Sequence, residues 1–126
     1  MKPGGIFAVE TPNLDSWDAR LFRDQYWGGY HIPRHWSLFR PETLTRLLQQ
    51  SGYEVLATEY KTGHSFWLYS IHHWLRYQGK PRVALARRFD PMGSLVALAA
   101  FTGFDILRKA AGFRTSAMLL IARKPA

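Results

Sequence analysis

The chain of 126 residues has the size of one domain, and a hydrophobic fraction of 47% with 15% aromatic residues excludes a disordered chain. The absence of cysteine excludes disulfide frameworks, thiolate metal sites and cysteine nucleophiles, and it fits a reducing compartment. The net charge of +8 arises in the second half, because residues 1–60 sum to −1 and residues 61–126 to +9.

A basic half of this kind is typical of a surface that meets a polyanion, either nucleic acid or an anionic membrane. It is also found as a solvated face of ordinary enzymes. No recognised nucleic-acid-binding module accompanies the charge, so we do not expect a nucleic-acid partner. We expect a cytoplasmic protein, with peripheral contact to the inner face of the membrane as a further possibility.

The chain begins with a strand and a short helix. Residues 6–10 form a continuous apolar run, which predicts a strand buried on both faces, as is usual where helices cover both sides of a sheet. Thr11, Pro12 and Asn13 end the run. Ser16, with Asp15 beside it, can cap a helix over residues 17–22.

Residues 27–39 read WGGYHIPRHWSLF, and no period of two or about 3.6 residues fits them. They therefore predict a loop. A loop so rich in aromatic and titratable side chains tends to line a pocket or to plug its mouth. This loop is the first candidate for a functional site.

A well-marked helix over residues 41–51 follows the loop. Pro41 fits its first position, and Gly52 fits the left-handed position after its end. Arg40 stands where Ser or Asp would normally cap the helix, so we expect a cap weaker by about 1 kcal/mol. Residues 53–60 then predict a second strand.

From residue 64 to residue 115 the sequence predicts a helical insert. Residues 66–77 favour a helix, residues 83–88 a shorter one, and Asp90 with Pro91 the start of a third that reaches about residue 109. Its apolar stretch of residues 95–104 is too short for the roughly twenty residues that span a bilayer. The apolar residues 116–122 predict the last strand.

The order of these elements resembles the C-terminal half of a class I S-adenosylmethionine-dependent methyltransferase. The most specific motifs are the run PRHWSLF at residues 33–39 and the run PETL at residues 41–44. The resemblance implies that residues 2–9 correspond to the fifth strand of the family and residues 41–51 to its last core helix. Residues 53–60 and 116–122 then correspond to its sixth and seventh strands.

One departure from the family pattern concerns the cofactor. The family holds S-adenosylmethionine with a glycine-rich loop after its first strand, yet the ten glycines here include no Gly-x-Gly. We therefore expect the acceptor-binding part of a methyltransferase, inactive without an N-terminal half and binding no cofactor by itself. The alternative is a non-catalytic binding module that uses its basic aromatic surface at an anionic membrane or a partner protein.

The resemblance implies that His35 and Phe39 border the site of a small-molecule or lipid-like methyl acceptor. Imidazole can take a hydroxyl proton near neutral pH, so His35 is the candidate catalytic residue, although it can equally just shape the loop. Trp27 and His31 belong to the same loop and are expected to bind substrate.

Two further residues complete the predicted substrate site. Asn13 ends the first strand, at the edge of the sheet where ligands bind in open α/β folds. Arg34 can hold an acidic group of the substrate, or it can pair with Asp18 or Asp24.

Two further interpretations concern the paired histidines and the helical insert. His31 with His35, and His72 with His73, lack a third ligand, so no metal site is expected. The insert combines aromatic and basic side chains that either meet anionic headgroups or form a lid on a missing half. These are Trp67, Tyr69, Trp74, Tyr77, Arg76, Lys80, Arg82, Arg87 and Arg88.

The fold class we expect is α/β, as one domain over residues 1–126. It is a partial Rossmann-like methyltransferase fold with a three-stranded mixed sheet in the order 1-3-2, the third strand central and antiparallel. Helices pack on the sheet, and the helical insert lies between strands two and three. The outer edge of the first strand would then be exposed, which predicts a homodimer or a covering partner.

Overall fold

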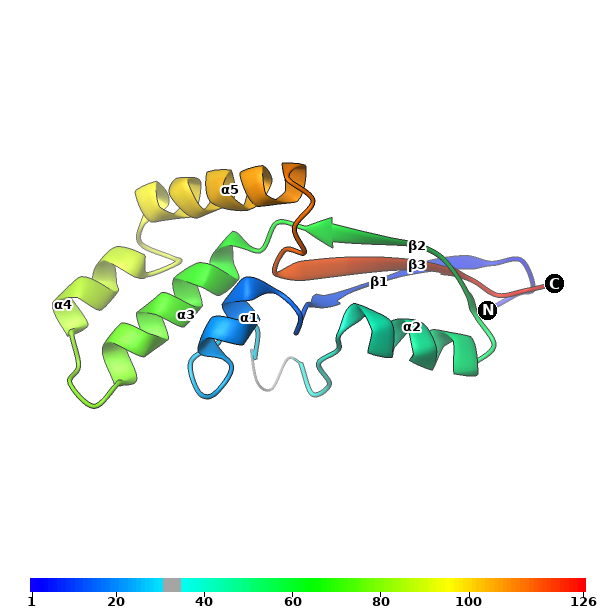
Figure 1. The fold of residues 1–126 in the computed structure, drawn as a ribbon, viewed down its shortest axis with the longest axis horizontal. Helices are drawn as coiled ribbons and strands as arrows, with labels where there is room; N and C mark the ends of the chain where they lie inside the picture. Colours follow the sequence, from blue (N-terminus) through cyan, green and yellow to red (C-terminus); the bar gives the residue numbers. More distant parts are fainter. Residues whose placement is uncertain (31–34) are drawn as a thin grey trace.

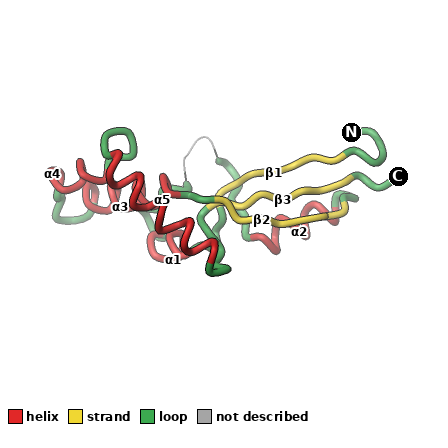
Figure 2. The backbone as a smooth tube through the Cα atoms, turned by 90° about the horizontal axis from the view of Figure 1, so that it is seen from above, coloured by secondary structure: helices red, strands yellow, loops and turns green. Residues whose placement is uncertain are grey.

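The computed structural model describes residues 1–30 and 35–126. The molecule is elongated, with a sheet at one end, a group of helices at the other, and both termini at the far end of the sheet (Figures 1 and 2). The elements in chain order are β1 (Ile6–Pro12), α1 (Trp17–Phe22), α2 (Pro41–Gln50), β2 (Glu54–Lys61), α3 (His64–Tyr77), α4 (Val83–Ala86), the 3-10 turn η1 (Arg87–Phe89), α5 (Leu95–Ala110) and β3 (Ala117–Arg123).

The three strands form one sheet in the order β1-β3-β2, and both strand pairs are antiparallel. Leu120 at the centre of β3 lies opposite Val9 of β1 and Thr58 of β2. The outer strands run in the same direction without pairing with each other. The predicted α/β class, strand order and central antiparallel third strand are confirmed. The sheet is antiparallel in both of its strand pairs rather than mixed.

The main core lies between the sheet and α2. Leu44 and Leu48 of α2 pack on Met118, Leu120 and Ala122 of β3, all of them buried. Since side chains alternate along a strand, the residues of β1 and β2 that reach this core share one face of the sheet. They include Phe7, Val9 and Val55.

The expectation that β1 is buried on both faces is wrong. Phe7 and Val9 face the core, whereas Ile6 and Ala8 alternate with them and are exposed, Ile6 to 62%. The reason is the layer arrangement, because α2 covers only one face of this sheet (Figure 1). A continuous apolar run cannot distinguish a strand covered twice from one covered once.

The ends of α2 follow the local signals of the sequence. Pro41 occupies the first turn, and Arg40 makes no side-chain cap hydrogen bond, as expected. Gly52 adopts φ of +80°, and the Tyr53 N–H returns to the carbonyl of Leu48 at 3.0 Å. This left-handed residue closes the helix at little steric cost because glycine has no Cβ.

The start of α5 differs from the prediction. The helix begins at Leu95 rather than at Pro91, and the Ser94 hydroxyl accepts the Ala97 N–H at 3.4 Å. Asp90 instead accepts the Met92 N–H through its carboxylate at 2.9 Å, forming a local turn. Aspartate favours such turns as readily as helix caps, and here the turn prevails.

The helices between β2 and β3 pack around α3. The ring of Trp67 is stacked on Phe101 of α5 at 6.1 Å and meets Phe104 edge-on at 5.5 Å. Phe22 of α1 meets the same indole edge-on at 6.4 Å. Trp67 is therefore the centre of a second, aromatic core, separate from the one beneath the sheet.

A buried ion pair on α5 holds both ends of the insert. Arg108 donates to Asp105 at 2.9 Å, and both side chains are buried. The second carboxylate oxygen of Asp105 accepts the Gly63 N–H at 2.6 Å, where the chain enters α3. Arg108 also donates to the carbonyl of Arg114 at 3.1 Å, just before β3. One pair thus fixes the points where the insert leaves and rejoins the sheet.

The guanidinium of Arg108 is enclosed by aromatic rings from three helices. It lies 4.9 Å from the ring centre of Trp17, 5.6 Å from that of Trp67 and 5.4 Å from that of Phe104. A desolvated cation over ring faces gains from the ring quadrupoles. These contacts connect α1 and α3 to the pair on α5.

Replacing Asp105 with Ala should lower the free energy of unfolding by about 3–5 kcal/mol, because it leaves the buried Arg108 cation unpaired. The double variant Asp105→Leu, Arg108→Met should recover only part of this loss, since it removes both charges but leaves the Gly63 N–H and the Arg114 carbonyl without their side-chain partners. Urea unfolding measures both effects.

The matched control is Arg123→Gln, which breaks the exposed pair of Arg123 with Glu54 and should cost at most about 1 kcal/mol. An Asp105→Ala variant that is no less stable than this control would refute the structural role of the buried pair.

Candidate functional site

The chain leaves β1 through a buried polar junction. The Asn13 N–H donates to the carbonyl of Ser116 at 2.9 Å, and its side-chain amide donates to the carbonyl of Thr115 at 3.0 Å. The carbonyl oxygen of that side chain accepts the Asp15 N–H at 2.9 Å. Asn13 is fully buried, so these bonds fix the end of β1 against the start of β3.

Asp18 connects this junction to the aromatic loop. Its carboxylate accepts the Trp27 indole N–H at 2.8 Å and the Ser116 hydroxyl at 2.7 Å. Asp18 and Trp27 are both almost completely buried. Hydrogen bonds to both carboxylate oxygens compensate for part of the cost of burying this group. Trp27 therefore anchors the start of the loop.

Gly28 brings the loop into close contact with α3. Its N–H donates to the Ser70 hydroxyl at 2.8 Å, and that hydroxyl donates to the carbonyl of Phe66 at 2.6 Å. A Cβ at position 28 would lie 2.5 Å from the same Phe66 carbonyl. Only glycine fits this approach, which explains one of the two adjacent glycines of the loop.

The far side of the loop brings His35 to the end of β1. A cleft of about 200 Å³ is lined by His35 and Phe66 together with Glu10, Thr11, Pro12 and Ala117. His35 is half-buried. Because ligands of open α/β sheets bind outside the carboxyl ends of strands, this position suits a histidine that faces a substrate.

The other predicted site residues take different positions. Phe39 packs on the core beneath the sheet, and its backbone forms a bridge with Asn13. His31 and Arg34 lie outside the described residues. The buried positions of Asn13 and Trp27 identify them as residues that hold the loop, and their predicted substrate contacts stay predictions.

A larger apolar cleft between α1 and α3 was not anticipated from the sequence. It has a volume of about 560 Å³ and is lined by Leu21, Phe22, Asp24, Gln25, Tyr26, Ile71 and Trp74. On the α3 side of this cleft, Ile71 is half-buried and Trp74 is exposed. The available signal in the sequence for this cleft was a short predicted helix, residues 17–22, together with a longer aromatic one, residues 66–77.

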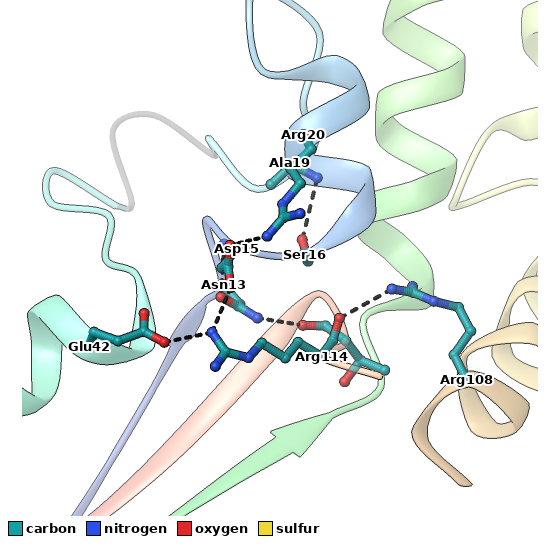
Figure 3. A network of polar contacts seen from close by, with 9 residues as sticks. Asn13, Asp15, Ser16, Ala19, Arg20, Glu42, Arg108 and Arg114 are labelled. Atoms are coloured by element: carbon teal, nitrogen blue, oxygen red, sulfur yellow. Dashed lines mark hydrogen bonds and ion pairs between the residues drawn. The ribbon is translucent and has the colours of Figure 1, made fainter. Parts of the chain in front are cut away.

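An ionic network lies beside the junction and joins α1, α2 and the segment before β3 (Figure 3). Arg114 donates to Asp15 and to Glu42 at 2.6 Å each, and Arg20 also pairs with Asp15. Burial raises the pKa of Asp15, but hydrogen bonds from Arg20 and Arg114 outweigh it and hold that pKa below its ordinary value. The pKa of Glu42 is lowered by a hydrogen bond from its own backbone and then by Arg114.

The histidines of α3 have structural contacts of their own. A ring nitrogen of His72 lies 3.0 Å from the carbonyl of Ala86, which joins α3 to α4. Within the described ranges 1–30 and 35–126, no three His, Cys, Asp or Glu side chains gather as a metal site would require.

Comparison with known proteins gives one match. Residues 1–58 match the family model of a methyltransferase domain. The match extends from the N-terminal turn through β1, the aromatic loop and α2 into β2, and it supports a methyltransferase-like function. The helices α3, α4 and α5 and strand β3 lie beyond it. No curated protein and no solved structure matches the chain.

Replacing Arg114 with Gln should shift acid unfolding to higher pH. The lowered pKa values of Asp15 and Glu42 stabilise the fold above their ordinary values of 3.8 and 4.5, and this contribution is lost as the pH falls through the lowered values. Without Arg114 the pKa values of both carboxyl groups rise toward their ordinary values. Their contribution to stability is then smaller, so the chain unfolds at a higher pH. Circular dichroism along an acid titration measures the midpoint.

The control is Arg23→Gln, which removes an exposed cation 3.6 Å from the exposed Asp24. It should leave the acid midpoint where it is. An unchanged midpoint in the Arg114→Gln variant would contradict the proposed coupling of these carboxylates.

Proposed function

We propose that this chain provides the acceptor-binding part of an S-adenosylmethionine-dependent methyltransferase, with His35 as the base for a hydroxyl acceptor. The position of His35 carries the proposal, because it shares a cleft with the carboxyl-terminal residues of β1. The methyltransferase match over residues 1–58 supports it independently.

The chemistry needs a base close to the acceptor. Methyl transfer to a hydroxyl oxygen is favoured when a side chain removes the proton as the new bond forms, and a neutral imidazole can do so near neutral pH. The residues that line the cleft with His35 suit this role. Phe66 and Pro12 supply apolar walls for a ring, and the anchored end of β1 holds the cleft in place.

The described residues do not fit the cofactor itself. The backbone N–H of Asn13, which follows β1, is already committed to Ser116, and the start of the next helix is capped by the Ser16 hydroxyl. No glycine-rich turn offers free N–H groups to a nucleoside there. We therefore assign the methyl-donor site to residues other than these, and His35 acts on the acceptor alone.

The apolar cleft between α1 and α3 supports a lipid-like acceptor. Its walls include Phe22, Ile71 and Trp74, which are suited to an apolar chain rather than to a charged group. Trp27 and Gly28 connect α1 to α3 beside it. The two clefts have no lining residue in common, so the apolar cleft is proposed as a separate site for an apolar chain.

Phenol and anisole provide the test, because they share a ring and differ in the hydroxyl proton. In nuclear magnetic resonance titrations of the labelled chain, phenol should shift the signals of His35, Thr11 and Phe66 and bind more tightly than anisole. The His35→Gln variant should lose this preference, since its amide is no proton acceptor of comparable basicity.

The matched control is His73→Gln, a half-buried histidine of α3 that does not line the cleft. It should retain the preference for phenol. Equal binding of phenol and anisole by the unmodified chain, or a preference that survives in His35→Gln, would overturn the proposal.

A further inference from the structure

Helix α5 has an inward side that is well packed. Phe101 stacks on Trp67 of α3, and Asp105 and Arg108 are buried in their ion pair. These residues recur at helical spacing and so mark the side of α5 that meets α3. Phe104 also meets the Trp67 ring, edge-on at 5.5 Å.

The outward side of α5 is apolar along its whole length. We call this set the α5 apolar face, and it consists of Leu95, Val96, Ala99, Ala100, Gly103, Ile106, Leu107 and Ala110. Leu95, Val96 and Leu107 are exposed to 81%, 83% and 71%. Helices of soluble domains normally carry polar residues on their outer face, so this face is expected to be covered in use.

Polar groups do not interrupt the α5 apolar face. The hydroxyl of Thr102 donates back to the carbonyl of Leu98 at 2.7 Å and is thereby satisfied. Lys109 in the last turn is exposed, and it supplies a positive charge at one end. Met92, in the turn before the helix, extends the apolar surface at the other end with 88% exposure.

The charge on the segments next to α5 is mainly positive. Arg87 and Arg88 are exposed just before the turn that leads into α5, and Lys109 lies after it. Arg76 at the end of α3, and Lys80 and Arg82 in the loop to α4, are exposed as well. Asp105 is neutralised by Arg108 in its buried ion pair, whereas Asp90 stays an anion before α5 and Glu59 of β2 lies near both Lys61 and Lys109. The exposed cations outnumber these two acids.

We propose that the α5 apolar face lies in the interface of an anionic lipid membrane, with the surrounding arginines and lysines on the headgroups. An apolar helix side flanked by cations has the composition of interfacial helices, and each cation near an anionic surface adds to the attraction. A second copy of this chain is disfavoured as the occupant because its net charge of +8 would be repelled.

The helix is too short for the alternative of crossing the bilayer. At 16 residues α5 falls short of a membrane span, and no helix in the part of the chain that the structure describes is long and apolar enough to cross. It therefore lies along the surface. This inference does not rest on the proposed methyltransferase function, because α5 lies outside the matched residues 1–58.

The structure relocates the surface that the sequence suggested. Trp67, one of the aromatics expected at the membrane, is buried in the core of the insert. Trp74 and Tyr77 at the end of α3 are exposed, and the guanidinium of Arg76 lies 5.6 Å from the ring centre of Tyr77. The apolar contact itself is now assigned to α5.

A single fluorescent label tests the contact directly, because the chain has no cysteine of its own. Val96→Cys carrying an environment-sensitive dye should shift its emission to the blue on vesicles of phosphatidylcholine with phosphatidylglycerol. Pure phosphatidylcholine should produce little change. The control label is at Leu47→Cys on α2, an apolar residue with 45% exposure, and its emission should stay constant.

Unlabelled variants give the second arm of the experiment. Val96→Glu and the double variant Arg87→Glu, Arg88→Glu should each weaken co-sedimentation with anionic vesicles roughly tenfold or more. Arg46→Glu, an exposed cation on α2, should have a much smaller effect. Circular dichroism confirms that each variant is folded.

Binding that is equal on neutral and anionic vesicles, or unchanged in Val96→Glu, would overturn the proposal. A Val96→Glu substitution that converts a dimer to a monomer in light scattering, without any vesicle binding by the unmodified chain, would show that a second copy covers this face instead. Neither result bears on the role of His35, which is tested separately with phenol and anisole.

Discussion

The buried ion pair between Asp105 and Arg108 is the constraint on which the arrangement of the molecule depends. Its carboxylate fixes Gly63, where the chain leaves the sheet, and its guanidinium fixes the carbonyl of Arg114, where the chain returns. A buried pair is costly unless its remaining hydrogen-bonding groups are satisfied, and here backbone groups supply most of the partners. The insert can therefore be long and helical while β2 and β3 stay in register.

The segment that the ion pair holds before β3 also connects the two ends of the molecule. Thr115 and Ser116, which follow the pinned Arg114, hold Asn13 at the end of β1 and the buried carboxylate of Asp18. His35 therefore lies at a strand end that is held in place. Helix α5 carries the ion pair on its inward side and its apolar face on its outward side. A membrane contact through α5 would hold the domain that carries the cleft between α1 and α3 at a lipid surface. This location suits a lipid-like acceptor.

Local signals predicted the parts of the fold that depend on neighbouring residues. Pro41 and Gly52 define the ends of α2 in both sequence and structure, and the family resemblance supplied the strand order. The burial of β1 was predicted wrongly because it depends on which layers cover the sheet. Arg108 shows the same limit. Its spacing from Asp105 is also that of many surface ion pairs, and its burial depends on Trp17 and Trp67, which enclose it only in the folded chain. The family resemblance supplied His35 as a candidate, and the structure places it in the cleft at the end of β1, whereas the anchoring of Trp27 required knowledge of Asp18.

The central claim is that this chain holds the acceptor side of a methyl-transfer site and leaves the donor side to other residues. Calorimetric titration of S-adenosylmethionine into the chain tests it most directly. We predict no binding tighter than roughly 100 μM, because the backbone N–H groups of residues 13–16, which follow β1, are all bonded within the chain. Saturable binding well below that concentration would contradict the account and would identify the chain as a complete cofactor site.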